Sequence, residues 1–421
     1  MDRKSKWLLL GAVLAAPLWG QEGRLRLKDL LEEALRNNPE IQAAQKRYEA
    51  MRQRPDQAGS LPETMLSLGY TSNGSPRPFA NLGIEPTSNA GFMVTQEFPF
   101  PGKRKLRGDM AMREAEAEFQ KYQQAQLTVV SRVKEAYHRL HHAWEVIDLL
   151  ESQRDLFRRM LSITEARYAV GRAEQQDVLK AQTQISILEA RIEKQRLDLR
   201  TRESDLHAVL NRLRVEPLPR PVDIAAGEFR LNLDELIRQA RASAPMLLEE
   251  EKMIQRGETA LNLARKDVYP DYALSAGYFN MGRMPDMYQF RVDFKLPTSF
   301  FRKQRAMVAE ESNQLQAARR SYAGAQQRLL AEIREAYLMG QSSAKLMELY
   351  GKTIGPQANL TLESSLAAYE AGKVDFLTVL MNLISVVETE ENYHMEMLQF
   401  HLSLVTLEEL TGLRLIDEEV L

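Results

Sequence analysis

The sequence contains no cysteine, which excludes disulfide bonds, thiolate metal sites, a cysteine nucleophile and a lipid anchor on an N-terminal cysteine. It also lacks an excess of either charge. Its 56 Lys and Arg residues stand against 58 Asp and Glu residues, so no charge imbalance points to nucleic acid as a partner. No Ser-His-Asp arrangement, phosphate-binding loop or HExxH motif is present. We therefore expect neither an enzyme nor a cofactor.

Long apolar runs are also missing, except at the N-terminus. There, basic residues precede Trp7–Leu18, a mostly apolar run of about a dozen residues that is too short to span a bilayer. With Gly20 as the cleavage residue, this pattern predicts a secretory signal peptide over residues 1–20, and a buried N-terminal helix is the alternative. No later stretch approaches the ~20 apolar residues of a membrane helix, so an exported chain that crosses a membrane must do so as a β-barrel.

The chain repeats itself once, at an offset near two hundred residues. The matches keep their order, which favours duplication over chance. They are residues 27–39 with 233–245, 62–70 with 270–278, 133–137 with 333–337, and 167–171 with 368–372. A proline-rich segment, residues 215–227, joins the halves. We predict a first structural repeat over residues 21–226 and a second over residues 227–421.

Each copy contains two predicted strands around a loop. In residues 288–296, apolar residues alternate with Gln289, Arg291, Asp293 and Lys295, and this period marks a strand with one apolar and one wet face. The length suits a tilted membrane strand of ~9–11 residues, in which the polar residues would line a water-filled lumen. A soluble hairpin packed on a core is the alternative. The predicted strands are residues 63–71, 91–99, 271–279 and 287–296, with Leu66, Leu68, Tyr70, Phe92, Val94 and Phe98 on one face.

Each strand pair runs into a long helical hairpin, predicted over residues 102–213 and 302–412. Residues 103–170 contain no proline and one glycine. At ~1.5 Å per residue they predict a helix on the order of 100 Å long. The second hairpin is predicted to kink or break near Pro356.

Apolar residues at spacings of three, four and seven predict coiled-coil seams along these hairpins. The seam residues are Val130, Val133, Tyr137, Leu140, Trp144 and Ile147 on the first long helix, Val178, Ile185, Ile192, Leu199 and Leu206 on the returning helix, and Val379, Val386, Tyr393, Phe400 and Leu407 in the second copy. Short helices, 27–37 and 39–58, open the first copy, and Asn38 is expected to cap the second of them. A cytosolic coiled-coil scaffold is the alternative, against which the signal peptide and the alternating strands argue.

These parts define a fold class that is mainly α with a small β part. Four membrane strands per chain cannot close a barrel, and an open sheet edge cannot lie in lipid. The strands must therefore close with copies of themselves, in a ring of identical chains. The duplicated long-helix hairpins would continue this wall as a periplasmic α-barrel. Such a conduit needs no reactive group.

Four stretches occur in order along this architecture. They are LLEEALRNNP at residues 30–39, FPFPGKR at 98–104, RYAVG at 167–171 with DVL at 177–179, and YEAG at 369–372. As an ordered set, they resemble the TolC-like outer-membrane efflux proteins over nearly the whole mature chain, about residues 27–413. The resemblance implies a homotrimer in outer-membrane lipid, with a twelve-stranded β-barrel and a long helical extension into the periplasm. It also implies docking with a periplasmic adaptor and an inner-membrane pump of the RND type.

Within this family, Pro-Gly-Lys-Arg at residues 101–104 resembles the branch that exports heavy-metal cations. So does Leu296-Pro297 with Phe301-Arg-Lys-Gln304, although this segment departs from the usual shorter turn. Export of drugs or organic solutes is the alternative cargo. A periplasmic coiled-coil scaffold or adaptor without a barrel is the alternative protein class.

Two glycine turns are predicted to form the periplasmic tips, because glycine permits the positive φ of a sharp helix-to-helix turn. The resemblance implies adaptor-docking residues at these tips: Val170, Gly171, Arg172, Ala371, Gly372 and Lys373. Asp177 and Asp375 follow the turns. Each is a candidate helix cap, favoured near a helix N-terminus, or part of an acidic periplasmic gate.

One helix carries a histidine cluster. His138, His141 and His142 lie three and four residues apart, a spacing that can hold Zn²⁺ or Cu²⁺ together with a third ligand. No carboxylate or cysteine partner is evident in the sequence. The cluster is therefore a weak metal candidate, and packing is the expected role.

Overall fold

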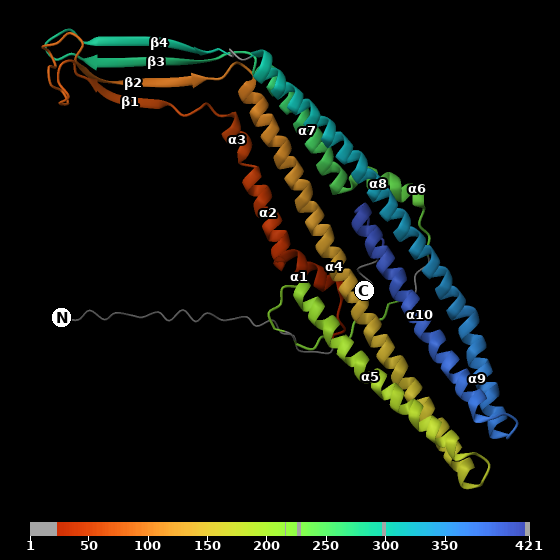
Figure 1. Cartoon of the computed structure of the whole chain (residues 1–421). Helices are drawn as coiled ribbons and strands as arrows, with labels where there is room; N and C mark the ends of the chain where they lie inside the picture. Colours follow the sequence, from red (N-terminus) through yellow and green to blue (C-terminus); the bar gives the residue numbers. More distant parts are fainter. Residues whose placement is uncertain (1–22, 215, 225–228, 297–299, 417–421) are drawn as a thin grey trace, which may run out of the picture.

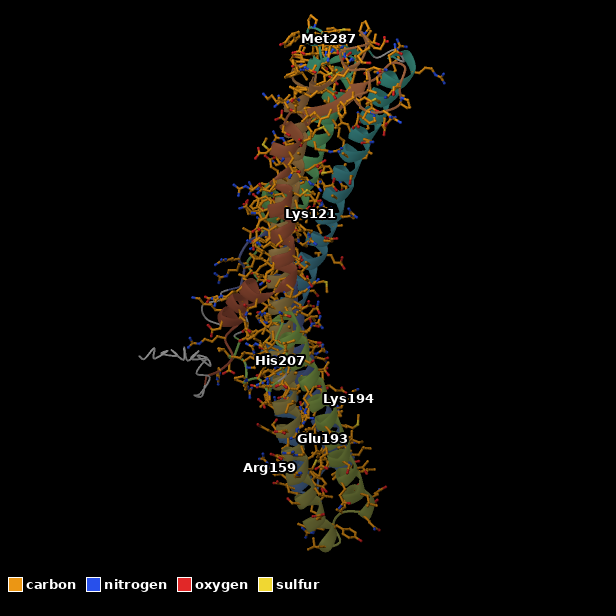
Figure 2. All side chains as sticks on the ribbon, turned by 90° about the vertical axis from the view of Figure 1, so that its left-hand side faces the viewer. Lys121, Arg159, Glu193, Lys194, His207 and Met287 are labelled. Carbon is orange, nitrogen blue, oxygen red and sulfur yellow. The ribbon has the colours of Figure 1, made fainter. Side chains whose placement is uncertain are left out.

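The computed structural model describes residues 23–214, 216–224, 229–296 and 300–416. The predicted signal peptide and the predicted boundary between the repeats lie outside these residues. The described chain is elongated and bent, with a four-stranded sheet that projects at an angle from one end of the long helices and two helix-to-helix turns at the other end (Figure 1). In the side view, Met287 lies at the sheet end, and the exposed Arg159, Glu193 and Lys194 lie along the opposite half (Figure 2).

The two copies share the same order of short helices, strand pair and long hairpin. The first copy contains α1 (Leu27–Asn37), α2 (Pro39–Met51), α3 (Arg54–Gly59), β1 (Met65–Thr71), β2 (Asn89–Phe98), α4 (Lys103–Ala169) and α5 (Gln175–Val209). The second contains α6 (Leu233–Ser243), α7 (Pro245–Lys266), β3 (Asp271–Asn280), β4 (Met287–Lys295), the π-helical turn η1 (Phe300–Gln304), α8 (Arg305–Leu349), the π-helical turn η2 (Tyr350–Ile354), α9 (Gly355–Glu370) and α10 (Phe376–Thr411). Among the described helices, none combines the length and the apolar character that a membrane crossing requires.

The helix predicted over residues 39–58 is two helices in the structure. A turn at residues 52–53 separates α2 from α3, which has Pro55 in its first turn. Proline has no N–H to continue the hydrogen-bond ladder, so the longer helix is interrupted ahead of it. The predicted cap is confirmed, because Asn38 Oδ1 accepts a 2.8 Å hydrogen bond from the backbone N–H of Glu40.

The predicted kink in the second hairpin is a π-helical turn. This turn, η2, lies directly before α9, which has Pro356 in its first turn. The widened turn accommodates the missing proline N–H and keeps the chain helical. The regular α-helix is therefore interrupted at η2, just before Pro356, and the hairpin continues beyond it.

Helix α4 connects the two hairpins, because it packs against α5 of its own hairpin and against α10 of the other. The predicted seam lies in these contacts. Val133, Tyr137, Leu140 and Ile147 are buried, and Val130 and Trp144 pack against them half-buried. On the partner helices, the buried seam residues are Ile192, Leu199 and Leu206 of α5 and Val379, Val386, Phe400 and Leu407 of α10.

A buried ion pair also joins the two copies. Lys134 Nζ of α4 lies 2.5 Å from Glu408 Oε2 of α10, and their side chains are only 2% and 8% exposed. The other carboxylate oxygen of Glu408 accepts hydrogen bonds from the backbone N–H groups of Leu415 (2.6 Å) and Ile416 (2.7 Å). The pair therefore ties α4, α10 and the C-terminal segment together.

The four strands form one antiparallel sheet in the order β1-β2-β3-β4. Their observed ends differ from the predicted ones by at most two residues. The two copies of the repeat meet at the β2–β3 pairing, so the sheet is shared between them.

Candidate functional site: an exposed sheet and two helical tips

One face of the sheet is apolar and open to the surroundings. The register aligns Leu66, Val94, Ala276 and Phe290 in one row across the four strands, and Leu68, Phe92, Tyr278 and Tyr288 in the next. Leu68 is 76% exposed and Phe290 is 83% exposed. A continuous apolar face of this kind is rare on monomers in water and marks a contact with lipid or protein.

The opposite face carries the predicted lumen residues. Gln289, Arg291, Asp293 and Lys295 alternate with the apolar residues of β4, and all but the half-buried Gln289 are exposed. Arg291 Nε donates a 2.8 Å hydrogen bond to Asp293 Oδ2, and Lys295 forms an ion pair with Glu97 of β2. This face therefore suits contact with water.

Both edges of the sheet are open. In the part of the chain that the structure describes, β1 pairs only with β2, and β4 pairs only with β3. Each outer strand therefore presents a row of backbone N–H and C=O groups that can pair with a further strand.

The two hairpin tips have the same backbone geometry. In the first, Gly171 has φ +72°, its N–H bonds to Tyr168 O, and Arg172 N–H bonds to Arg167 O. In the second, Gly372 has φ +73°, with the same pair of bonds from Gly372 and Lys373 to Tyr369 and Ala368. These bonds define a Schellman motif, which the positive φ of glycine permits. All six predicted docking residues are exposed.

An arginine that the sequence analysis did not select connects the tips. Arg167 Nη1 donates hydrogen bonds to the backbone carbonyls of Tyr369 and of Glu370 (3.1 Å for the second). Its guanidinium carbon lies 4.5 Å from the centre of the Tyr369 ring, as in a cation–π contact. In the repeat, Arg167 of the first copy corresponds to Ala368 of the second, the residue before Tyr369. The sequence signal for this contact is therefore that only one of the two copies has an arginine at this position.

The two gate candidates differ in their surroundings. Asp375 caps α10, because its carboxylate accepts hydrogen bonds from the backbone N–H (2.9 Å) and the hydroxyl of Thr378, which lower the pKa of Asp375. Asp177 lies in the first turn of α5 and is half-buried. The capping role is thus observed for Asp375, and the gate role of both residues stays a prediction.

The turn at residues 101–104, after β2, connects the two copies of the repeat. Lys103 is 3% exposed, and its Nζ donates 2.9 Å hydrogen bonds to Tyr269 O and Asp271 Oδ1, next to the start of β3. It therefore holds the start of α4 against the second copy.

The predicted histidine trio does not form one group. In the described part of the chain, His141 is the member of the trio that is grouped with two other potential metal ligands, the carboxylates of Glu145 and Asp223. His138 instead stacks on His401 of α10, with ring centres 4.6 Å apart. Burial lowers the pKa of His138 well below its usual range, and that of His401 to about 4.

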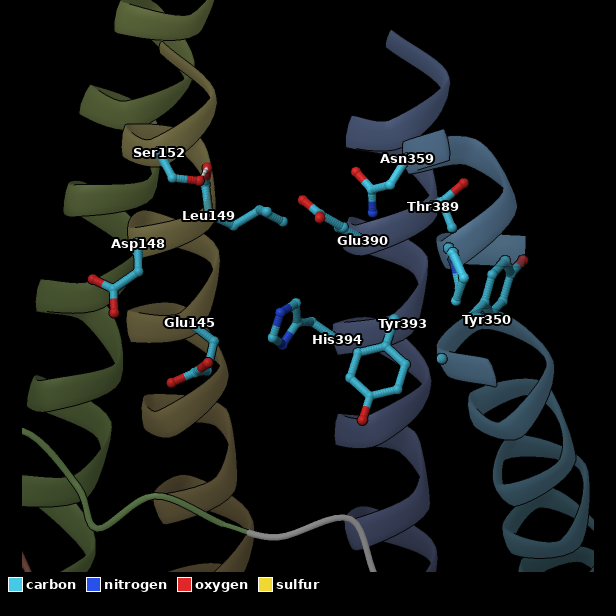
Figure 3. A pocket seen from close by; sticks show the side chains of 13 residues that line it. Glu145, Asp148, Leu149, Ser152, Tyr350, Asn359, Thr389, Glu390, Tyr393 and His394 are labelled. Atoms are coloured by element: carbon cyan, nitrogen blue, oxygen red, sulfur yellow. Dashed lines mark hydrogen bonds between the residues drawn. The ribbon is translucent and has the colours of Figure 1, made fainter. Parts of the chain in front are cut away.

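A cavity of about 570 Å³ lies beside this region, between α4 and α10. Glu145 and Asp148 line it from α4 (Figure 3). His394 projects toward α4 from α10 (Figure 3), and residues of η2 together with Pro356 also line the cavity. The cavity is thus lined by ionisable groups next to the interrupted helix.

Comparison with known proteins places this architecture. A family model described as "Outer membrane efflux protein" matches residues 30–212 and 236–413. "Outer membrane protein TolC" of Salmonella enteritidis is 26% identical over 364 residues, which is 82% of this chain and 72% of that protein.

Two solved structures illustrate the likeness of the fold. CusC superimposes with a TM-score of 0.78 at 16% identity, over 94% of this chain and 95% of that one. VceC of Vibrio cholerae superimposes with a TM-score of 0.77 at 18% identity, over 92% of this chain and 96% of that one. Both likenesses extend over more than nine-tenths of each chain.

Proposed function

Since the chain belongs to the family of outer membrane efflux proteins, we propose that it is the outer-membrane channel subunit of a tripartite efflux system. One observation carries the proposal. A sheet with an exposed apolar face, a polar opposite face and two open edges is continuous with helices too long for a compact domain. This combination suits a wall that faces lipid on one side and water on the other.

Copies of the chain complete the wall. The open edges of β1 and β4 pair between neighbouring subunits, and a trimer of four-stranded sheets closes a twelve-stranded barrel in the outer membrane. Arg291, Asp293 and Lys295 then face the lumen, while Leu68 and Phe290 face lipid. The long hairpins continue the conduit into the periplasm, and the chain performs no catalysis.

Arginine substitutions on the two faces of β4 test this arrangement. We expect Val292→Arg to abolish the outer-membrane trimer, because an arginine at the lipid midplane costs about 2–4 kcal/mol. The neighbouring Gln289→Arg, on the polar face, is expected to assemble normally. The measurement is the amount of heat-modifiable oligomer in outer-membrane fractions. Equal assembly of both variants would contradict the proposed orientation of the sheet.

The helical tips are proposed to dock a periplasmic adaptor, whose partner is an inner-membrane pump of the RND type. Because the chain has no cysteine, single cysteines give a clean cross-linking signal. Val170→Cys and Ala371→Cys avoid the strain of replacing glycines with positive φ, since Val170 and Ala371 have φ −100° and −76°. Both are expected to cross-link to the adaptor.

Leu197→Cys is the matched control for the tips. Leu197 is 66% exposed but lies along α5, away from the turn. It is expected to give no adaptor adduct. Cross-linking from Leu197 but not from Val170 or Ala371 would move the docking surface away from the tips.

The proposed cargo is heavy-metal cations, supported by the resemblance of residues 101–104 to that branch. Lys103 has a structural role there, so the motif does not bind the cargo itself. Deleting the gene tests the cargo: we expect lower tolerance of metal salts with unchanged tolerance of drugs. The opposite pattern would support export of organic solutes instead.

A further inference from the structure

A histidine and two carboxylates from distant parts of the chain converge beside α4. One ligand atom each from His141, Glu145 and Asp223 lies within 4.8 Å of the other two. His141 and Glu145 are four residues apart on α4, so they share one face of that helix. Asp223 comes from the segment that connects the two copies. Such a set of one imidazole and two carboxylates matches the donors that Zn²⁺ and similar ions take.

The backbone around Asp223 is anchored to α4 rather than loose. Leu25 and Pro221 form a parallel bridge, in which Leu25 N–H donates to Arg220 O (2.9 Å) and Val222 N–H donates to Leu25 O (3.2 Å). The Tyr137 hydroxyl of α4 donates to Leu25 O (3.1 Å) and accepts from Val222 N–H (3.2 Å). The neighbour of Asp223 is thus fastened one helical turn from His141, so little ordering is needed to bring the carboxylate to the site.

The imidazole of His141 gives a second observation, independent of the grouping, that points to a bound ligand. The His141 side chain is 6% exposed, and its Nε2 has no hydrogen-bond partner among the described residues. Buried polar atoms are normally paired. The distance of 3.8 Å between His141 Nε2 and Glu145 Oε1 is too long for a hydrogen bond. This distance is close to the roughly 3.4 Å between two ligand atoms that are each ~2.1 Å from the same tetrahedral metal ion.

Two arginines form ion pairs with the carboxylates of Glu145 and Asp223, so a metal ion would have to compete with them. Arg220 contacts Glu145 Oε1 (2.9 Å) through Nη2 and Asp148 Oδ2 (2.5 Å) through Nη1, and Arg24 pairs with Asp223. An incoming ion would replace one contact of Arg220 and leave that with Asp148. The Arg24–Asp223 pair has both side chains more than half exposed and is easily given up.

We propose that His141, Glu145 and Asp223 form a binding site for a divalent transition-metal ion, with Zn²⁺ as the probe. The mixed nitrogen and oxygen donors favour this class over Ca²⁺ or Mg²⁺, which prefer all-oxygen sites. The ion fastens the connecting segment to α4 beside the cavity of Figure 3. The site lies on the interior of α4, away from both the tips and the sheet, so metal binding there can be tested independently of the proposed channel function.

The test uses the purified full-length oligomer in detergent at neutral pH, stripped with EDTA and dialysed. Calorimetric titration with Zn²⁺ is expected to give saturable binding of one ion per chain. Titration with Co²⁺ is expected to give the visible absorption of a site with nitrogen and oxygen ligands. Glu145→Gln and Asp223→Asn are each expected to weaken binding by roughly tenfold or more. Arg220→Gln is expected to strengthen it, because a competing cation is removed.

His142→Gln is the matched control, since His142 is adjacent in sequence but outside the group of three. It is expected to bind Zn²⁺ like the unmodified protein, and retained oligomer on gel filtration confirms that each variant is folded. Absence of saturable binding in the unmodified protein would overturn the proposal. So would binding that survives both carboxylate substitutions, or a loss in His142→Gln equal to that in Glu145→Gln.

Discussion

Replacing Lys134 with methionine is expected to lower the free energy of unfolding by about 3–5 kcal/mol. The reason is the charge left behind: Glu408 would stay buried, 8% exposed, without Lys134 as its counter-ion. The hydrogen bonds from the backbone N–H groups of Leu415 and Ile416 would not neutralise that charge. The measurement is denaturant unfolding of the detergent-solubilised protein. The loss also separates α4 from α10, so proteolysis of the C-terminal segment after Leu415 should become faster.

A paired substitution separates this effect from lost packing. Lys134→Met with Glu408→Gln removes both charges and is expected to recover much of the stability, as neutral replacements of buried pairs often do. Arg158→Met is the matched control. It breaks the pair with Glu189, whose side chains are both 51% exposed, and is expected to change stability by less than about 1 kcal/mol. Equal losses at Lys134 and Arg158 would refute the role of burial.

Acidification is expected to destabilise the protein through the stacked histidines of α4 and α10. Burial lowers the pKa of His401 to about 4, whereas an unfolded histidine titrates near 6.5. Between these values the unfolded chain binds a proton that the folded chain refuses, so stability rises with pH across this window. From pH 6.5 down to 4, His401 is expected to cost about 3 kcal/mol. His138, whose pKa lies well below 6.5, adds a loss of the same sign.

The measurement is the denaturation midpoint between pH 4 and 8, in EDTA to keep metal ions from contributing. The ionisable side chains of Lys134 and His141 act electrostatically on the stacked histidines, and both are left in place. His401→Leu is expected to flatten the profile below pH 6.5 and leave it unchanged above. His207→Gln, at a buried histidine of α5 outside the stack, is the control and is expected to keep the slope. A slope that persists in His401→Leu would assign the pH dependence to other groups.

Much of the fold could be predicted because its signals are local and repeated. Strict alternation in residues 288–296 located β4 to within one residue, and the seven-residue spacing through Val379 and Phe400 located the buried face of α10. The single failure in the short helices, at residues 52–53, arose because the effect of Pro55 competed with a continuous helical pattern. A long periodic segment carries many such signals, and a short one carries few.

The candidate sites were harder to predict because they depend on contacts across the two copies. Arg167 reaches Tyr369 more than two hundred residues away, and Lys103 reaches Asp271 across the sheet joint. The pattern of histidines on α4 was visible, but its division between a stack with His401 and a group with Asp223 required the packing of α10 and the connecting segment. Sequence spacing gives the face of a helix and not the element that covers it.

The β2–β3 pairing has a consequence for how the assembled protein forms. In a ring of three such chains, every hairpin adjoins two others, and one of these two seams lies inside a single polypeptide. Half-length chains would have to form six seams by collision, whereas duplicated chains form three. The covalent link makes the internal seams intramolecular, so their formation does not depend on the concentration of the chain. The duplication therefore makes half of the contacts between hairpins part of the folding of one chain, and only the other half form by association of subunits.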